Sequence, residues 1–89
     1  MSRDPYVAYA LEMGHLLKRL RRETGMSQER VAHAAGITAF TYQKYEKGES
    51  SPGVPMNPLT TTLLRLSAVF GVEPGDLFPP DPPDLSEGR

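Results

Sequence analysis

The stretch that most constrains the fold is residues 27–48, SQERVAHAAGITAFTYQKYEKG, in which a glycine separates two short runs of helical apolar spacing. The small residue Ala32 lies where two crossing helices would approach each other. Gly36 lies where a tight turn requires a positive φ, which glycine adopts at little cost. The other apolar positions supply one buried seam: Val31, Ala35, Ile37, Tyr42 and Tyr45. The pattern predicts two helices joined by a turn of three or four residues, a helix-turn-helix.

Capping and helix-breaking residues predict five helices in all. Asp4-Pro5 is an N-cap followed by proline at the first helical position, so the first helix is expected over about residues 5–23. Gly14 weakens this helix, so a break is possible there, and Gly25 ends it. The remaining helices are expected at about 28–35 (capped by Ser27), at about 39–46 (capped by Thr38), from Asn57-Pro58 to about Phe70, and from Pro74 to Phe78. Residues 49–57, rich in proline, glycine and serine, are expected to form a loop.

The chain resembles the Cro/C1-type helix-turn-helix family, which includes the lambdoid phage repressors. Matches to that family continue on both sides of the central motif and cover about residues 13–78. They are Met13-Gly14, Leu17, Leu20-Arg21, Gly25 and Ser27-Gln28 before it, and Leu63, Leu66, Gly71-Val72 and Asp76-Leu77-Phe78 after it. The resemblance implies an all-α, five-helix bundle of the lambda-repressor-like DNA-binding type over residues 1–78. Residues 79–89 are acidic and rich in proline, and their composition predicts a disordered tail.

The resemblance also implies which residues meet DNA. The helix at 39–46 is expected to lie in the major groove, where its exposed side chains read base edges. The implied contacts are Gln28, Thr38, Ala39, Phe40, Thr41, Gln43, Lys44 and Lys47. Gln28 and Lys47 are expected on phosphates, Lys44 on guanine and Gln43 on adenine. Arg21 and Glu46 match the positions of a structural ion pair in the family.

Phe40 follows Ala39 at the start of this helix, where better-known members of the family carry polar residues. Neither side chain can form a hydrogen bond, so contact with the thymine C5-methyl group is the readout left to them. The alternative is that Phe40 packs against the preceding helix or another subunit and reads nothing.

Charge is segregated along the chain although the net charge is only −1. Residues 15–48 hold seven basic and three acidic residues, a net charge of +4, whereas residues 73–89 carry −4. A basic face that meets nucleic acid is expected from this distribution. A local charge run, common in helical proteins, is the competing interpretation.

Composition excludes several classes of protein. The chain has no cysteine, which excludes disulfides and thiolate metal sites and fits a reducing cytoplasm. The sequence contains no run of about 18 apolar residues, so no membrane span is expected. His15 and His33 lack metal-ligand spacing, and no activated nucleophile or phosphate-binding glycine loop is present. A cytoplasmic protein that is not an enzyme and holds no cofactor is expected.

The leading hypothesis is a sequence-specific transcriptional regulator that binds double-stranded DNA at a pseudo-palindromic site as a homodimer. By family analogy the self-associating surface joins the end of the fourth helix with Val72, Leu77 and Phe78, and Tyr6 to Leu11 is the second candidate. The alternative is a protein-interaction module, such as an antitoxin or adaptor, whose helix-turn-helix is secondary or silent. Its protein partner would bind the C-terminal tail. A third interpretation is the N-terminal part of a longer regulator.

Overall fold

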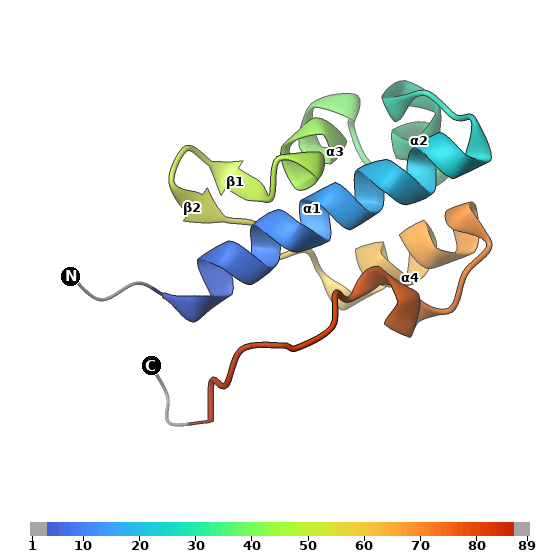
Figure 1. Cartoon of the computed structure of the whole chain (residues 1–89). Coiled ribbons are helices and arrows are strands. Elements are labelled where there is room, and N and C mark those ends of the chain that lie inside the picture. Colours follow the sequence, from blue (N-terminus) through green and yellow to red (C-terminus); the bar gives the residue numbers. More distant parts are fainter. Residues whose placement is uncertain (1–3, 87–89) are drawn as a thin grey trace.

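A long first helix forms the axis around which the other elements are arranged. In the computed structural model, which describes residues 4–86, helix α1 (Pro5–Thr24) runs across the molecule (Figure 1). Helices α2 (Gln28–Ala34) and α3 (Ala39–Glu46) lie along one side of it, and α4 (Thr60–Phe70) lies along the other. Strands β1 (Glu49–Ser51) and β2 (Val54–Pro55) form an antiparallel hairpin beside α3, and a 3-10 helix, η1 (Pro74–Leu77), follows α4.

Helix α1 begins and ends where its capping residues predict. The Asp4 carboxylate accepts a hydrogen bond from the Tyr6 backbone N–H at 2.9 Å, and Gly25 closes the helix with a φ of 74°. The break that the sequence admits at Gly14 does not occur. A Cβ added to Gly14 would lie 2.7 Å from the Glu46 carbonyl oxygen and 2.8 Å from the Gly48 nitrogen. Gly14 therefore allows α1 and the end of α3 to cross at backbone contact distance.

The predicted helix-turn-helix is present as α2 and α3. The Ser27 hydroxyl accepts a hydrogen bond from the Arg30 N–H at 3.1 Å, and the Thr38 hydroxyl accepts one from the Thr41 N–H at 3.0 Å. Gly36 has the expected positive φ of 73° in the turn. Each helix thus begins at a side-chain cap that satisfies a backbone donor without an intrahelical partner.

The expectation of a loop over residues 49–57 is wrong, because part of this segment is the β1–β2 hairpin. Two hydrogen bonds of Met56 hold it, one that closes the hairpin and one to the distant helix α1. The Met56 N–H donates to the Gly48 carbonyl at 2.9 Å, and the Tyr6 hydroxyl donates to the Met56 carbonyl at 2.8 Å. Met56 itself is fully buried. The Tyr6 side chain therefore attaches the hairpin to α1, and no local sequence pattern predicts this contact.

The end of the bundle also differs from the five-helix expectation. Helix α4 begins at Thr60 rather than at the Asn57-Pro58 pair, and its N-cap Leu59 is 72% exposed. The last element is a 3-10 helix, not a fifth α-helix. In its first turn the Glu73 N–H donates to the Asp76 carboxylate at 3.0 Å, a local bond that suits a single short turn. The described residues hold four α-helices, one 3-10 helix and a two-stranded sheet.

One hydrophobic core joins every helix. Its largest fully buried side chains come from all parts of the fold: Met13, Leu17, Val31, Tyr42, Met56, Leu66 and Leu77. The start of the tail packs on this body, since Pro79 is buried and its carbonyl accepts a hydrogen bond from the Tyr9 hydroxyl at 2.7 Å. Pro79 therefore belongs to the packed body, whereas residues 80–86 form no helix or strand and are mostly exposed, so a disordered tail stays a prediction. Residues 1–3 and 87–89 lie outside the described part of the chain.

Candidate nucleic-acid interface

The ion pair predicted between Arg21 and Glu46 is present and joins three helices. The Arg21 Nε lies 2.6 Å from Glu46 Oε2, and its Nη2 donates to Oε1 at 3.2 Å, so the pair is bidentate. The Arg21 Nη1 donates to the Met26 carbonyl at 3.0 Å, and the Gln28 amide donates to Glu46 Oε1 at 2.9 Å. The exposed fractions of the two charged side chains are only 14% and 4%. This network fixes the end of α3 against α1 and the start of α2.

Opposing effects set the pKa of the Glu46 carboxyl. Burial alone would raise it, but the hydrogen bonds from Arg21 and Gln28, together with the Arg21 charge, outweigh burial and lower it. The hydrogen bond to Glu46 in turn raises the pKa of the Arg21 guanidinium. Burial, followed by the nearby Glu46 carboxylate, raises the pKa of Tyr42 strongly. At neutral pH the site therefore holds an ionised pair beside a neutral phenol.

Helix α3 presents a largely exposed edge beyond this network. Phe40 is 68% exposed, and the Lys44 Nζ lies 4.4 Å from the centre of its ring. Gln43 and Lys44 are partly exposed, and Lys47 is exposed. An open groove lies between this edge and the hairpin, lined by Phe40, Lys44, Lys47 and residues 49–52. This edge carries both amide and ammonium donors, the groups that read guanine and adenine in a major groove.

The other residues that the resemblance implies as DNA contacts are partly buried or already hydrogen-bonded within the protein. Ala39 is partly buried and packs against the core. The Thr38 hydroxyl is committed to capping α3 and donates to the Thr41 hydroxyl at 3.0 Å. One amide hydrogen of Gln28 is bound by Glu46, as described above. Phe40, Gln43, Lys44 and Lys47 are therefore the positions of α3 with most capacity for a ligand.

Lys18 also belongs to this surface, although it is not among the DNA contacts expected from the sequence. It lines a second hollow together with Gln28, Gln43, Glu46 and Lys47. Lys18 precedes Arg21 by three residues on α1, and residues at this spacing are neighbours on a helix surface. That spacing is the signal that could have identified it.

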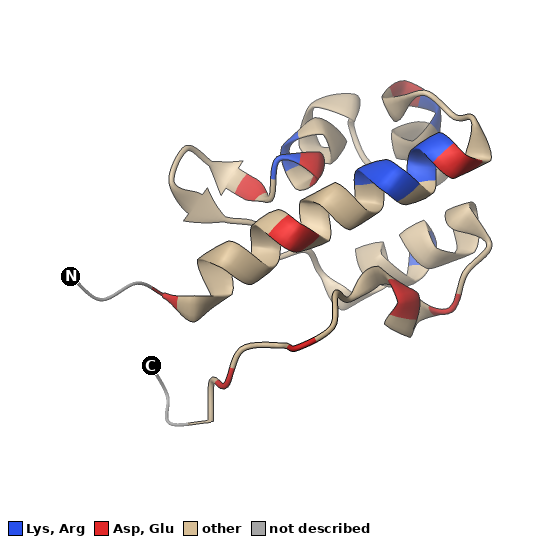
Figure 2. Cartoon of the chain, viewed as in Figure 1, with Lys and Arg blue, Asp and Glu red and all other residues tan. Residues whose placement is uncertain are grey.

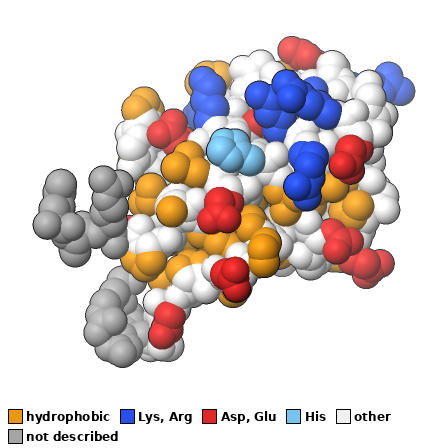
Figure 3. All heavy atoms as spheres, in the orientation of Figure 1, with side chains coloured by type: hydrophobic (Ala, Val, Ile, Leu, Met, Phe, Trp, Pro, Cys, Tyr) orange, Lys and Arg blue, Asp and Glu red, His pale blue; other side chains and the backbone are white. Residues whose placement is uncertain are grey.

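The basic side chains gather at one end of α1. Figure 2 shows Lys and Arg on the second half of α1 and on α2 and α3, interspersed with some Asp and Glu, whereas the segment after α4 and the tail show Asp and Glu alone. In the space-filling view the blue side chains lie together on the upper part of the face, above an area of mixed apolar and acidic side chains (Figure 3). The part of the sequence with net positive charge thus lies on α1, α2 and α3, apart from the acidic tail.

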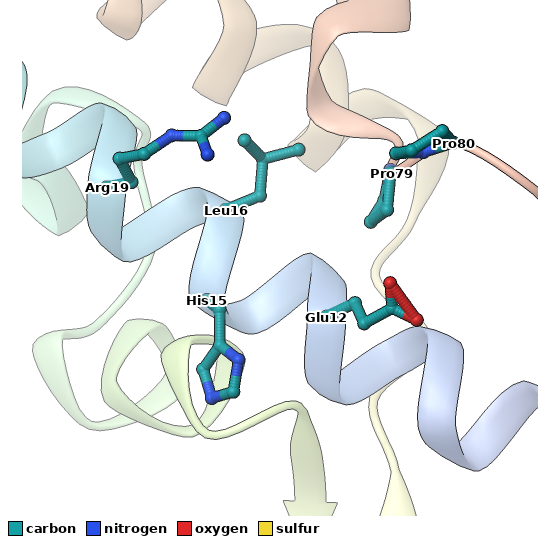
Figure 4. A pocket seen from close by; sticks show the side chains of 6 residues that line it. All are labelled: Glu12, His15, Leu16, Arg19, Pro79 and Pro80. Atoms are coloured by element: carbon teal, nitrogen blue, oxygen red, sulfur yellow. The ribbon is translucent and has the colours of Figure 1, made fainter.

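A third hollow lies away from α3, between α1 and the beginning of the tail. Glu12, His15, Leu16 and Arg19 line it on one side and Pro79 and Pro80 on the other (Figure 4). The His15 ring points away from the two prolines. Among residues 4–86, no group of three or more His, Cys, Asp or Glu side chains is placed to hold a metal ion. In the same range, no helix is both long enough and apolar enough to cross a bilayer.

Comparison with known proteins gives a match over most of the chain. The sequence model of a family described as "Helix-turn-helix domain" matches residues 12–79. The chain belongs to this family. It is 41% identical over 59 residues to YonR of Bacillus subtilis (strain 168), an SPbeta prophage-derived uncharacterized HTH-type transcriptional regulator. That alignment covers 66% of this chain and 49% of YonR, so this helix-turn-helix chain spans about half the length of its curated relative.

Two solved structures share its fold. The restriction-modification controller protein C.AhdI from Aeromonas hydrophila superposes with a TM-score of 0.70 at 28% identity, covering 80% of this chain and 98% of that protein. A structure of Co(II) HppE in complex with Tris buffer also gives a TM-score of 0.70, at 30% identity. This second match covers 91% of this chain but only 42% of HppE. The fold therefore occurs both as a nearly whole small protein and as part of a longer chain.

Proposed function

We propose that this helix-turn-helix protein is a sequence-specific DNA-binding transcriptional regulator that inserts α3 into the major groove. The observation that carries the proposal is the exposed edge of α3, which presents Gln43, Lys44 and Lys47 while Glu46 anchors the same helix from behind. A rigidly held helix that offers amide and ammonium donors suits direct readout of base edges. The similarity to a transcriptional regulator and to a controller protein supports the same function.

The roles of the side chains follow from their positions. Gln43 and Lys44, in the middle of α3, are assigned to adenine and guanine edges. Lys47 at the end of α3, Lys18 on α1 and Gln28 at the start of α2 surround one hollow, and we assign them to phosphates of the DNA backbone. Lys18 supplies from α1 a positive charge that the hairpin lacks, because residues 49–64 contain neither lysine nor arginine.

We further propose that the protein binds a pseudo-palindromic site as a homodimer. One recognition helix covers only a few base pairs, and a two-fold dimer would place two half-sites about one helical turn apart. Of the apolar residues suggested for self-association, Leu77 is fully buried in the core and cannot contribute. Phe78 is 48% exposed and Leu11 is 42% exposed, so each remains available, at the two candidate surfaces. Light scattering of the free chain and of its DNA complex tests this stoichiometry.

Salt dependence of binding tests the DNA-binding proposal. With about four to six phosphate contacts per subunit, log K should fall with log salt at a slope of about −0.9 per phosphate neutralised. The variant Lys47→Gln should weaken binding to all duplexes and reduce this slope by about 1. Arg19→Gln is the matched control, because it removes the same charge from α1 at the hollow beside Pro79 instead of the α3 surface.

Three results would contradict this proposal. A binding constant for duplex DNA that does not change with salt would remove the electrostatic contribution on which it depends. Equal losses in Lys47→Gln and Arg19→Gln would show that general charge, rather than the α3 surface, holds the duplex. An absence of binding at low salt would instead favour the protein-interaction module, whose partner would bind the acidic tail.

A further inference from the structure

Phe40 is an exposed aromatic residue in the middle of a polar surface. Its side chain is 68% exposed on the first turn of α3, and it is not one of the hydrophobic residues that make up the core or pack on it. The groove beside it is bounded on its other side by residues 49–52 of the hairpin. An exposed phenylalanine leaves a large apolar area in water, which contact with an apolar group of a ligand would remove.

Lys44 does not extend freely from the same edge. Its ammonium lies 4.4 Å from the centre of the Phe40 ring, within the range of a cation–π interaction. The two residues are four apart and so lie on one face of the helix, about 6 Å apart along its axis. The Lys44 side chain therefore reaches back along this face, and the cation and the ring occupy one place on the surface.

We propose that Phe40 and Lys44 form one recognition unit for a C5-methylated pyrimidine beside a guanine. This inference rests on the proposed function, because it assumes that α3 enters the major groove. Phe40 has no hydrogen-bonding group, so the pyrimidine methyl is the only base-edge feature that it favours. Lys44 donates hydrogen bonds only, and guanine O6 and N7 are the acceptor pair that such a donor recognises best.

The spacing of the two groups assigns them to neighbouring base pairs. Base pairs are stacked about 3.4 Å apart, and the ammonium lies only 4.4 Å from the ring centre, so the two groups are close enough together to meet adjacent base pairs. Lys44 covers one face of the ring, which leaves the ring edge and the other face for a methyl group. The ring also holds the ammonium in place before DNA binds, so less side-chain freedom is lost on binding.

The one carboxylate that lines this groove is held within the hairpin. Glu49 Oε2 accepts a hydrogen bond from the Gly53 N–H at 3.2 Å. The rest of the hairpin wall is Ser50, Ser51 and Pro52, which carry no charge. The groove thus has an apolar and a cationic wall on α3, which suit a methyl group and a guanine acceptor edge, opposite a hairpin wall with one carboxylate.

Thymine and 5-methylcytosine carry the same methyl group at the same place in the major groove. The experiment therefore measures the affinity of the full chain for the duplex that it enriches most from a random library, with single bases of that selected duplex replaced. Thymine is compared with uracil opposite adenine, and 5-methylcytosine with cytosine opposite guanine. Each comparison removes one methyl group and leaves the pairing unchanged. The neighbouring guanine is compared with 7-deazaguanine, which lacks the N7 acceptor.

Loss of the methyl group is expected to weaken binding about fourfold in each half-site, the value of one buried methylene-sized group. Phe40→Ala should abolish this difference, so that thymine and uracil bind equally. Phe40→Leu is the matched control, because it retains the apolar contact and removes the aromatic ring. It should preserve the thymine preference and reduce the guanine preference. Lys44→Met should lose the guanine preference and keep the methyl preference.

The outcomes separate this inference from the function on which it rests. Wild-type chain that binds a selected duplex tightly, with no effect of methyl removal at any position, would overturn the recognition unit and leave DNA binding intact. A methyl effect that survives in Phe40→Ala would also overturn it. Failure to bind any duplex would overturn both. Because Phe40 is exposed, its variants should keep the wild-type circular dichroism spectrum and melting temperature.

Discussion

Replacing Gly14 with alanine is expected to destabilise the protein, although intrinsic helix propensity favours the opposite result. Alanine in place of glycine inside an exposed helix stabilises by about 1 kcal/mol. Gly14, however, is buried where α1 crosses the end of α3. Its new Cβ would lie 2.7 Å from the Glu46 carbonyl oxygen and 2.8 Å from both the Gly48 nitrogen and the Tyr45 carbonyl oxygen.

These three neighbours are backbone atoms, so none of them can rotate away. Relief requires that α1 and α3 separate, and inserting a group into a packed interior typically costs about 1–3 kcal/mol. Because all three contacts are shorter than 3.0 Å, we take the cost as about 2–3 kcal/mol, which exceeds the propensity gain by about 1–2 kcal/mol. In a domain of this size that difference lowers the melting temperature by roughly 5–15 °C. The shift of α3 should also weaken DNA binding more than the loss of stability explains.

Thermal unfolding followed by circular dichroism measures the effect, and Gly75→Ala provides the control. A Cβ added to Gly75 would meet no heavy atom within 4 Å, and Gly75 has no positive φ. Its replacement should therefore leave the melting temperature nearly unchanged or raise it slightly. A Gly14→Ala variant that melts at or above the wild-type temperature would refute the argument that this glycine is required for the helix crossing.

Two further predictions concern the buried polar groups behind α3. Because the pKa of Glu46 is lowered in the folded protein, its contribution to stability is present above the unfolded pKa and is lost as pH falls through the folded value. Glu46→Gln should therefore cost about 3 kcal/mol at pH 7 and much less at acid pH, measured by urea unfolding; an equal cost at pH 7 and pH 3 would contradict this. The Tyr42 hydroxyl is buried and makes no hydrogen bond with any described residue, so Tyr42→Phe should leave stability unchanged or raise it by about 1 kcal/mol. A loss of more than 1 kcal/mol in the same urea assay would show that the hydroxyl is bonded to Arg21 or Glu46.

The parts of the fold that sequence predicts well are those set by neighbouring residues. Asp4, Ser27 and Thr38 cap helices through bonds to backbone groups two or three positions away, and such bonds leave a local pattern. The hairpin could not be predicted in the same way. Its strands have three and two residues, and its stability depends on contacts from Gly48 and Tyr6 to Met56.

In the candidate site too, contacts between residues close in sequence can be predicted and contacts between distant residues cannot. The Arg21–Glu46 pair is predicted only from a resemblance, because two residues 25 apart in sequence give no local sign of contact. The Phe40–Lys44 contact has helical spacing and could have been inferred from the sequence, but the exposure of Phe40 could not. Leu77 is assigned to a surface by analogy and is instead a core residue, since η1 folds back on α4.

Selection of bound sequences from a random duplex library by the full chain tests the central claim most directly. The proposed role of α3 predicts enrichment of one motif with two inverted half-sites, their centres about 10 base pairs apart. Lys44→Met should select a motif changed at its guanine positions, whereas Arg19→Met should select the wild-type motif. If no sequence is enriched at low salt, or if the Lys44 variant selects the same motif as wild type, α3 does not read DNA as proposed.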